Sequence, residues 1–295
     1  MRTLVVGANG LVGSRLVSTL LTAGHHVAAI GRGDRRFKGE ASYHSVDLAD
    51  AAGLTKVVTT EKPELILNCA AMTDVDGCER EPENAWTANV DGVATLAKAA
   101  KATGAHFVHV STDYVFDGVT GNYSPDSIPN PRGTYAVTKY VGEQAVRSLA
   151  GSWAIARTAV VFGWPAAGQK NFGSWLVDAL GKGTPVKLFD DQWVNPSMAL
   201  NVADMVAELG TRKLTGIWHT CGADVVDRVQ FGKALCAKFG FDPSLITPSK
   251  MADVKLASPR PSRSGLDVKK TVDTLIAKPW SLDVALGRFV TEVKG

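Results

Sequence analysis

The first half of the chain alternates short apolar runs with longer segments of helical periodicity. Apolar runs occupy residues 3–7, 26–30, 64–69, 106–110 and 153–157, and a shorter one occupies 43–46. Strands this apolar are typical of a parallel sheet that is buried on both faces. Between them, apolar residues recur at helical spacing over 11–24, 50–60, 84–103 and 134–149. The alternation predicts an α/β fold with a doubly wound parallel sheet, the Rossmann arrangement.

After Gly163 the alternation becomes looser. The pattern predicts a loop, a strand, a helix, a second strand and a mostly irregular Pro-rich stretch, at residues 164–173, 185–190, 201–210, 216–222 and 243–261. We expect residues 1–160 to form the Rossmann domain. Residues 161–295 are expected mainly to form a smaller C-terminal lobe, with some of its segments returning to the sheet.

Composition and charge exclude several classes of protein. The 295 residues are 45% hydrophobic and 21% charged, with a net charge of +3, as in an ordinary globular protein. So small a charge, without a dense Lys/Arg run, argues against nucleic acid as a partner. No apolar stretch approaches the ~20 residues of a membrane span. The N-terminal MRTLVVGANG leads directly into a strand and a glycine turn, so neither a signal peptide nor a membrane partner is expected.

The cysteines and histidines do not form a metal-binding pattern. Cys69, Cys78, Cys221 and Cys236 lie far apart, with no CxxC pair and no histidine at zinc-finger spacing. The adjacent pair His25–His26 belongs to a predicted strand entry, where successive side chains point to opposite faces. We therefore expect free thiols, no metal site and a reducing, cytoplasmic compartment.

A glycine-rich turn joins the first predicted strand to the first predicted helix. Its GxxGxxG spacing allows a tight turn and lets backbone N–H groups and the helix N-terminus approach a pyrophosphate. Such turns also occur for packing reasons, but the strand–turn–helix context here favours a dinucleotide. The predicted cofactor contacts in this turn are Gly7, Asn9, Gly10, Leu11, Val12 and Gly13.

The end of the second predicted strand indicates which dinucleotide is bound. An NAD-selective protein places a carboxylate roughly 20 residues after the glycines, but this chain has Gly31 and Arg32 there. A guanidinium can pair with a 2′-phosphate, and Gly31 leaves space for it. We predict NADPH, with NADH as the alternative if Asp34 contacts the ribose. Further cofactor contacts are expected after the third and fourth strands, at Asp47, Leu48, Cys69, Ala70 and Ala71.

Tyr135 and Lys139 are four residues apart in a predicted helix and therefore share one face. A phenol with a pKa of ~10 is a poor proton donor near neutrality, and a neighbouring ammonium lowers that pKa. The lysine can also hydrogen-bond the nicotinamide ribose. YxxxK is common by chance, but here it follows HVSTDYVF (109–116) by one element, in a sheet that carries the glycine turn.

The chain resembles an extended short-chain dehydrogenase/reductase and, more closely, the dTDP-4-dehydrorhamnose reductase family. The resemblance covers nearly the whole length. It rests on GANGLVG (7–13), NCAAMTDVDGCE (68–79), NVDG (89–92), STDYVFDG (111–118), YAVTKYVGE (135–143), RTAVVFG (157–163), DDQWVNPS (190–197), GIWH (216–219) and RPSRSGLD (260–267). It implies that the first domain binds NADP and that the C-terminal lobe binds substrate.

The resemblance also implies catalytic roles. Tyr135 would protonate the developing alkoxide while NADPH delivers hydride, Thr112 would hydrogen-bond the same oxygen, and Lys139 would orient the cofactor. Tyr135 and Lys139 thus contact the cofactor as well. Asn89 matches a helix asparagine that supports a proton-relay water in many relatives, and we place it with the cofactor contacts.

The residues implied to bind substrate are Val75, Asp76, Thr112, Asp113, Val160, Asn195 and Arg260. Arg260 or Arg263 would lie near a nucleotide diphosphate. Two positions depart from the family pattern: Val160 stands where many members have Trp, and Arg263 where Asn is usual. The chemistry is therefore better defined by the sequence than the sugar.

The resemblance implies an NADPH-dependent reductase of the 4-keto group of a nucleotide-linked 6-deoxy sugar. The first expectation is conversion of dTDP-4-dehydro-L-rhamnose to dTDP-L-rhamnose, in polysaccharide biosynthesis. One alternative is a reductase of another nucleotide 4-keto sugar. The other is a non-catalytic regulatory subunit like methionine adenosyltransferase β, which binds a dinucleotide. A homodimer is compatible with the family.

Overall fold

The computed structural model describes residues 1–165 and 170–294. Its centre is a seven-stranded parallel sheet in the order β11-β6-β5-β4-β1-β2-β3. The strands are β1 (Arg2–Val6), β2 (His26–Gly31), β3 (Ser42–Ser45), β4 (Leu65–Asn68), β5 (His106–Thr112), β6 (Ser152–Thr158) and β11 (Gly216–His219). The strand order reverses direction at β1 and β4, which confirms the predicted doubly wound sheet.

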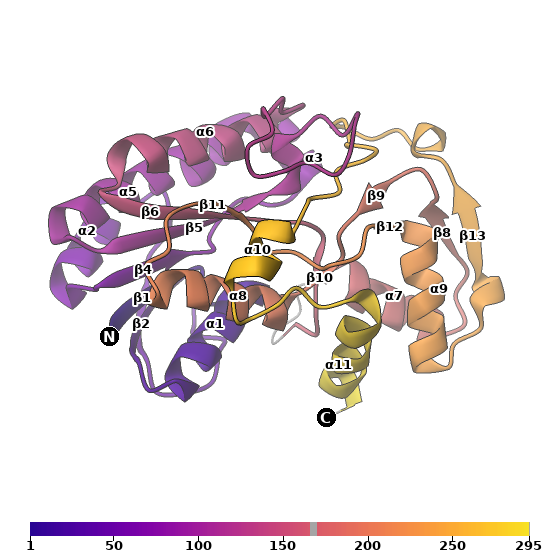
Figure 1. Cartoon of the computed structure of the whole chain (residues 1–295), viewed down its shortest axis with the longest axis horizontal. Helices are drawn as coiled ribbons and strands as arrows, with labels where there is room; N and C mark the ends of the chain where they lie inside the picture. Colours follow the sequence, from indigo (N-terminus) through magenta and orange to yellow (C-terminus); the bar gives the residue numbers. More distant parts are fainter. Residues whose placement is uncertain (166–169, 295) are drawn as a thin grey trace.

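Helices cover both faces of this sheet (Figure 1). α2 (Ala51–Glu61), α5 (Gly92–Thr103) and α6 (Thr134–Leu149) lie on one face, and α1 (Leu11–Thr22) and α8 (Ala199–Thr211) lie on the other. Alternate residues of β1 supply the two cores. Val5 packs on the α1/α8 side, whereas Leu4 and Val6 pack on the α2/α5 side. A strand used on both faces has no polar side, which explains the uninterrupted apolar runs.

The predicted helix over 84–103 is divided in the structure. It consists of α4 (Pro82–Trp86), a π-helical turn η1 (Thr87–Asp91) and α5. A π turn widens the helix locally, and such turns are frequent at functional sites. Periodicity could not reveal it, because the side chain that fixes it, Asn89, bonds to a distant segment, as described below.

Residues of the second half build the smaller lobe at the right of Figure 1. It contains α7 (Phe172–Gly181), α9 (Arg228–Phe239), α11 (Leu282–Lys294) and a parallel pair of strands, β8 (Val186–Phe189) and β13 (Ile246–Ser249). Phe162, Phe231 and Phe289 lie at its core. The Phe162 ring packs edge-on against the other two, at centroid distances of 5.2 and 5.4 Å.

Two short ladders and several small elements complete this half. β7 (Val161–Phe162) pairs with β10 (Ser197–Met198), and β9 (Trp193–Val194) pairs with β12 (Val226–Asp227). The remaining elements are the helices α3 (Val75–Arg80) and α10 (Lys269–Thr274) and the 3-10 turns η2 (Asp113–Val115), η3 (Pro243–Leu245) and η4 (Met251–Asp253).

Two predictions for the second half need correction. Only residues 216–219 of the predicted strand 216–222 are extended, and they pair with β6 at the sheet edge. Part of the predicted loop 164–173 (166–169) lies outside the described residues. The helix α7 already begins at Phe172, because Asn171 caps it: its Oδ1 accepts from Ser174 N at 3.1 Å.

Within residues 1–165 and 170–294, no helix is long and apolar enough to cross a membrane. The four cysteines are free thiols, and three of them are buried.

Candidate active site

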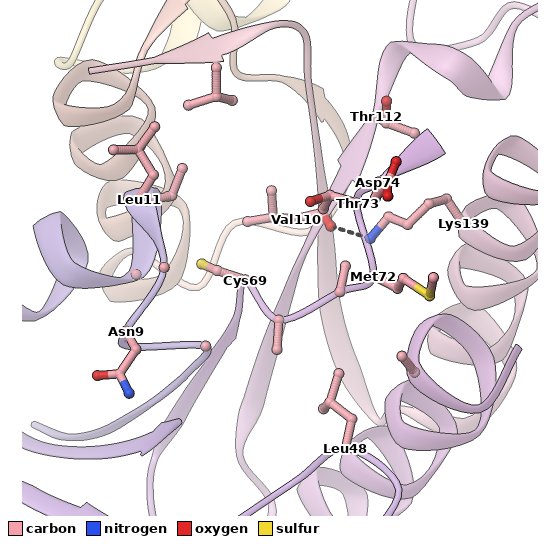
Figure 2. Close-up of a pocket in the computed structure, with 18 of the residues that line it drawn as sticks. Asn9, Leu11, Leu48, Cys69, Met72, Thr73, Asp74, Val110, Thr112 and Lys139 are labelled. Carbon is pink, nitrogen blue, oxygen red and sulfur yellow. Dashed lines mark hydrogen bonds between the residues drawn. The ribbon is translucent and has the colours of Figure 1, made fainter. Parts of the chain in front are cut away.

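A cavity of about 1420 Å³ lies at the carboxyl ends of the central strands, where doubly wound sheets bind ligands. Its Rossmann side is lined by the glycine turn and by the residues that follow β2, β3, β4 and β5. Phe172 and Arg228 line it from the smaller lobe. In Figure 2, Asn9 and Leu11 lie on one side, Thr112 and Lys139 on the other, and Cys69 between them.

The glycine turn packs too closely for side chains. Gly7 has φ +84°, and a Cβ added there would lie 2.7 Å from Ala70 N. A Cβ on Gly13 would lie 2.1 Å from Gly7 O. α1 begins at Leu11, and no side chain caps its first turn. The backbone N–H groups of this turn therefore form a cradle that fits a pyrophosphate.

Asn9 organises the loop that follows β2. Its Nδ2 donates to Arg32 O at 3.0 Å and to Asp34 O at 2.9 Å, and its Oδ1 accepts from Arg36 N at 2.9 Å. Although Asn9 lines the cavity, its amide holds this loop in place. Gly31 is needed for the same packing: a Cβ there would lie 2.9 Å from Asn9 Nδ2. Packing against Asn9 is thus a second reason for glycine at this position, beside the predicted space for a phosphate.

The loop after β2 presents two arginines to the cavity. Arg32 and Arg36 both line it, whereas Asp34 does not. Arg32 is exposed, and its Nη1 lies 3.9 Å from Asp47 Oδ2. Arg36 was missed in the sequence, where GRGDRRFKG offered several arginines without indicating which would face inward.

The remaining predicted cofactor contacts also meet at this cavity, with one exception. Asp47, Leu48, Cys69, Ala70 and Ala71 all line it. Burial raises the pKa of the Cys69 thiol to about 12, so this cysteine lines the cavity as a neutral thiol.

The exception is Asn89, which does not line the cavity. Its Oδ1 accepts from Met72 N at 2.9 Å, and its Nδ2 donates to Met72 O and Thr138 Oγ1, both at 3.1 Å. Asn89 is fully buried. The predicted direct contact between Asn89 and the cofactor is therefore not supported by the structure. It fixes the Met72 segment, which does line the cavity (Figure 2).

Thr112, Tyr135 and Lys139 all line the cavity: the helical spacing predicted a shared face for the last two, and the family resemblance implied that Thr112 joins them. Thr112 ends β5, and α6 presents the other two from the neighbouring face. α6 is fixed to the sheet by the buried ion pair between Glu143 Oε2 and Arg157 Nη2, at 2.7 Å.

Lys139 is held by a backbone acceptor. Its Nζ donates to Val110 O at 2.8 Å, the dashed line of Figure 2. Burial lowers the pKa of Lys139 to about 8, against the opposing effect of Glu143. Burial also raises the pKa of Tyr135, which the Thr112 hydroxyl partly counteracts. The predicted lowering of the tyrosine pKa by the lysine is therefore outweighed by the burial of the phenol.

A buried chain behind Lys139 was not recognised in the sequence. Ala70 N donates to Asn68 Oδ1 at 3.1 Å, so Asn68 Nδ2 faces His109 Nδ1, also at 3.1 Å. His109 Nε2 in turn lies 3.4 Å from Lys139 Nζ. Burial holds the pKa of His109 well below its ordinary value. The imidazole is therefore neutral near neutral pH.

Asp113 and Tyr114 also line the cavity. Thr112 Oγ1 donates to Asp113 Oδ1 at 3.1 Å, and Ser264 Oγ from the second half donates to Oδ2. Burial raises the pKa of Asp113 to about 6. Tyr114 packs edge-on against Tyr135, with centroids 5.6 Å apart.

The predicted substrate contacts divide into two groups. Val75, Thr112, Asp113 and Val160 line the cavity; Val160 does so with φ +39°, which is strained for a β-branched residue. Asp76, Asn195 and Arg260 do not line it, and each has a structural partner instead.

Arg260 Nη2 donates to Asp76 Oδ2 at 2.7 Å, so these two residues neutralise one another. Asn195 is fully buried, and its Oδ1 accepts from Leu266 N at 2.7 Å. Arg263, the other residue predicted near a diphosphate, lines a separate hollow of about 320 Å³. Arg228, a cation that the smaller lobe presents to the main cavity, carries no sequence motif and was missed.

No group of three or more His, Cys, Asp or Glu side chains in the described parts of the chain could hold a metal ion.

Comparison with known proteins places this site in a family. The chain is 38% identical to the probable low-salt glycan biosynthesis reductase Agl14 of Haloferax volcanii, over 91% of this chain and 90% of that one. It is 33% identical to the dTDP-4-dehydrorhamnose reductase of Streptomyces griseus, over 90% and 85%. It is also 31% identical to the methionine adenosyltransferase 2 subunit beta of Xenopus tropicalis, over 91% and 81%.

A solved structure shares the whole fold. The crystal structure of dTDP-4-dehydrorhamnose reductase from Bacillus anthracis, in complex with NADP, has a TM-score of 0.87 and 26% sequence identity, and 99% of each chain is covered. The sheet, the glycine turn and the Tyr–Lys pair define an extended short-chain dehydrogenase/reductase. The chain belongs to the family described as RmlD substrate binding domain, whose model matches residues 1–294. The predicted resemblance is thus confirmed.

Proposed function

We propose that this protein reduces the 4-keto group of a nucleotide-linked 6-deoxy sugar with NADPH, and that the substrate is dTDP-4-dehydro-L-rhamnose. One observation carries the proposal. Thr112, Tyr135 and Lys139 face a single cavity that continues to the glycine turn, so a carbonyl beside the tyrosine also lies beside the nicotinamide end of a dinucleotide.

The chain's own residues supply the acid and hold the reactants. Tyr135 gives its phenolic proton to the alkoxide oxygen as the carbonyl is reduced. Thr112 hydrogen-bonds the same oxygen, which requires its proton to turn away from Asp113. Lys139, held by Val110 O, faces the nicotinamide ribose and keeps positive charge near the phenolate that forms. When bound, NADPH supplies the hydride.

The cofactor assignment rests on the loop after β2. Arg32 and Arg36 offer two cations to a 2′-phosphate, and Asp34, the residue that would contact a free ribose, is outside the cavity lining. The N–H cradle of the glycine turn holds the pyrophosphate. The dTDP-4-dehydrorhamnose reductase from B. anthracis was solved with NADP, which supports the same choice here.

Two alternative functions differ from the proposed one, the first in its sugar substrate and the second in requiring a partner enzyme. A reductase of another nucleotide 4-keto sugar is favoured by Val160, where many family members have Trp, and by the similarity to a glycan biosynthesis reductase. A regulatory role is favoured by the similarity to methionine adenosyltransferase 2 subunit beta. Co-purification with a larger enzyme, and no NADPH oxidation with any keto sugar, would support that role.

The direct test follows NADPH oxidation by absorbance with enzymatically prepared dTDP-4-keto-6-deoxy sugars. Tyr135→Phe should lower kcat by about 10²- to 10⁴-fold, the contribution of a general acid. Tyr114→Phe, which alters the neighbouring phenol that packs on Tyr135, is the matched control and should keep most of the activity. Equal rates for wild type and Tyr135→Phe would exclude Tyr135 as the acid.

The proposal includes a cytoplasmic location and a homodimer. The free cysteines agree with a reducing compartment. Light scattering on the purified protein measures its assembly.

A further inference from the structure

In the part of the chain that the structure describes, one cation in the substrate half of the cavity forms no salt bridge with a carboxylate. Arg260 is paired with Asp76, at 2.7 Å. Lys170, which also lines the cavity, lies 3.2 Å from Asp178. Arg263 lines the separate hollow. The remaining cation on this side is Arg228, the first residue of α9.

Arg228 is held in a fixed orientation by two contacts. Its Nε donates to Gln192 Oε1 at 3.0 Å. Its guanidinium lies over the Phe172 ring, 4.5 Å from the centroid, a cation–π contact that also keeps the plane of the group in place. Among residues 1–165 and 170–294, the two terminal nitrogens, Nη1 and Nη2, have no acceptor. They form a ready fork for a ligand with two oxygens.

The surroundings leave the charge of Arg228 undercompensated. Burial lowers the pKa of Arg228, against the opposing effects of Tyr114 and Asp113, and Arg260 lowers it further. The Asp113 carboxyl already accepts hydroxyl hydrogen bonds from Thr112 and Ser264. Burial makes a carboxyl with a pKa of about 6 a weak counter-ion near neutrality. A half-buried cation without a full partner is stabilised when an anion joins it.

Arg228 also lies within one side chain of the reacting centre. Tyr114 packs edge-on against Tyr135, and its phenol is also hydrogen-bonded by Gln192, the residue that holds Arg228. Arg228 and Tyr135 are therefore linked through Tyr114 and line the same cavity. In a nucleotide sugar, the diphosphate on C1 and the keto group on C4 lie on opposite sides of the sugar ring.

We propose that Arg228 is the anion-binding residue of the substrate half and takes the diphosphate of a nucleoside diphosphate sugar. This inference rests on the proposed function and names the contact that orients its substrate. With the diphosphate on Arg228, the opposite side of the sugar ring faces Tyr135 and Thr112. Arg228 thereby replaces Arg260 and Arg263 in the role predicted from the sequence.

The test measures binding and so does not depend on turnover. Calorimetry on the full chain saturated with NADP⁺ would compare dTDP, dTMP and thymidine. Arg228→Gln should weaken dTDP binding by about 10- to 100-fold, the range for a lost charge-assisted pair, and leave thymidine binding unchanged. Arg228→Lys, which keeps the charge but loses the fork, should give an intermediate loss. Arg263→Gln is the matched control and should bind dTDP as wild type does.

Each outcome decides one question. Wild-type dTDP affinity in Arg228→Gln would overturn the inference, as would an equal loss of affinity for thymidine. Unchanged NADPH affinity shows that the variant is folded. If Arg228→Gln does not fold, the Lys variant carries the test, and a loss shared by thymidine would overturn the inference. An Arg228-dependent dTDP site in a protein that reduces no keto sugar would refute the proposed function and leave the subsite standing.

Discussion

Asp113 is a buried carboxyl at the centre of the cavity, and its raised pKa makes a prediction about stability. Burial raises the pKa from 3.8 to about 6, so the folded state holds a proton that the unfolded state has released between these values. The stability that this proton contributes is complete below the unfolded pKa and is lost as pH rises through about 6. The difference corresponds to about 3 kcal/mol at most.

Asp113→Asn removes this dependence while keeping a side chain that can bond Thr112 and Ser264. Its free energy of unfolding, relative to wild type, should rise by up to about 3 kcal/mol between about pH 4 and pH 7. Urea unfolding at several pH values measures it. Asp117→Asn is the control, because the Tyr123 hydroxyl lowers the pKa of Asp117 and its contribution is lost only as pH falls below about 4, so this variant should show little pH dependence between about pH 4 and pH 7. A pH-independent difference for Asp113→Asn would show that the carboxyl is ionised throughout.

Residue types and their spacing in the sequence were enough to predict the glycine turn and the Tyr–Lys pair of the site. Gly7, Gly13, Tyr135 and Lys139 follow from turn geometry and from helical spacing. His109 could not be assigned in this way, although it stands in the quoted motif. Its partners, Asn68 and Lys139, come from another strand and a helix, and only the packed sheet brings them together.

At the level of elements, the π turn η1 links the catalytic helix to the cavity wall. Asn89 bonds Met72 and Thr138 at once. Asn89→Ala removes the hydrogen bonds to Met72 N and Met72 O in this half-buried segment, although Met72 O keeps a contact with Cys78 Sγ at 3.7 Å. The substitution should lower the free energy of unfolding by about 2 kcal/mol. It should also raise the KM for NADPH, because Met72 lines the cavity.

Chemical unfolding and initial rates measure the two effects of Asn89→Ala. Asn84→Ala, an exposed site whose amide bonds only Glu81, should stay within about 0.5 kcal/mol of wild type. Equal effects of the two substitutions would show that the π turn does not depend on Asn89. The sequence predicted helix at both positions but not the turn, since apolar periodicity averages over one extra residue.

At the level of the whole molecule, the sequence predicted the doubly wound sheet and the return of some second-half segments to it, but not which segments return. β11 pairs with β6, and α8 covers the face beside α1. A four-residue strand such as GIWH carries little periodicity, and its partner is determined by how the chain closes over the sheet. The same closure decides which arginine faces the substrate. Arg228, Arg260 and Arg263 are equivalent as sequence, but their partners differ.

Cofactor binding should stabilise the whole chain, and Arg32 should decide which cofactor does so more strongly. A ligand at about 100 times its Kd adds about 2.7 kcal/mol to the free energy of unfolding. Arg32 is 81% exposed, so its pairing with a 2′-phosphate is partly screened by solvent. Arg32→Ala should therefore weaken NADPH about five- to tenfold and leave NADH unchanged.

Thermal unfolding with each cofactor measures this difference. Compared with wild type, Arg32→Ala should show a smaller rise in Tm on adding NADPH and the same rise on adding NADH. Arg36 also lines the cavity, so the double substitution Arg32→Ala with Arg36→Ala should remove the remaining preference for NADPH. Lys38→Ala, in the same loop but outside the cavity lining, is the matched control and should leave both shifts unchanged. Because NADPH and NADH differ only in the 2′-phosphate, equal losses for both would mean that these arginines support the loop rather than bind the phosphate.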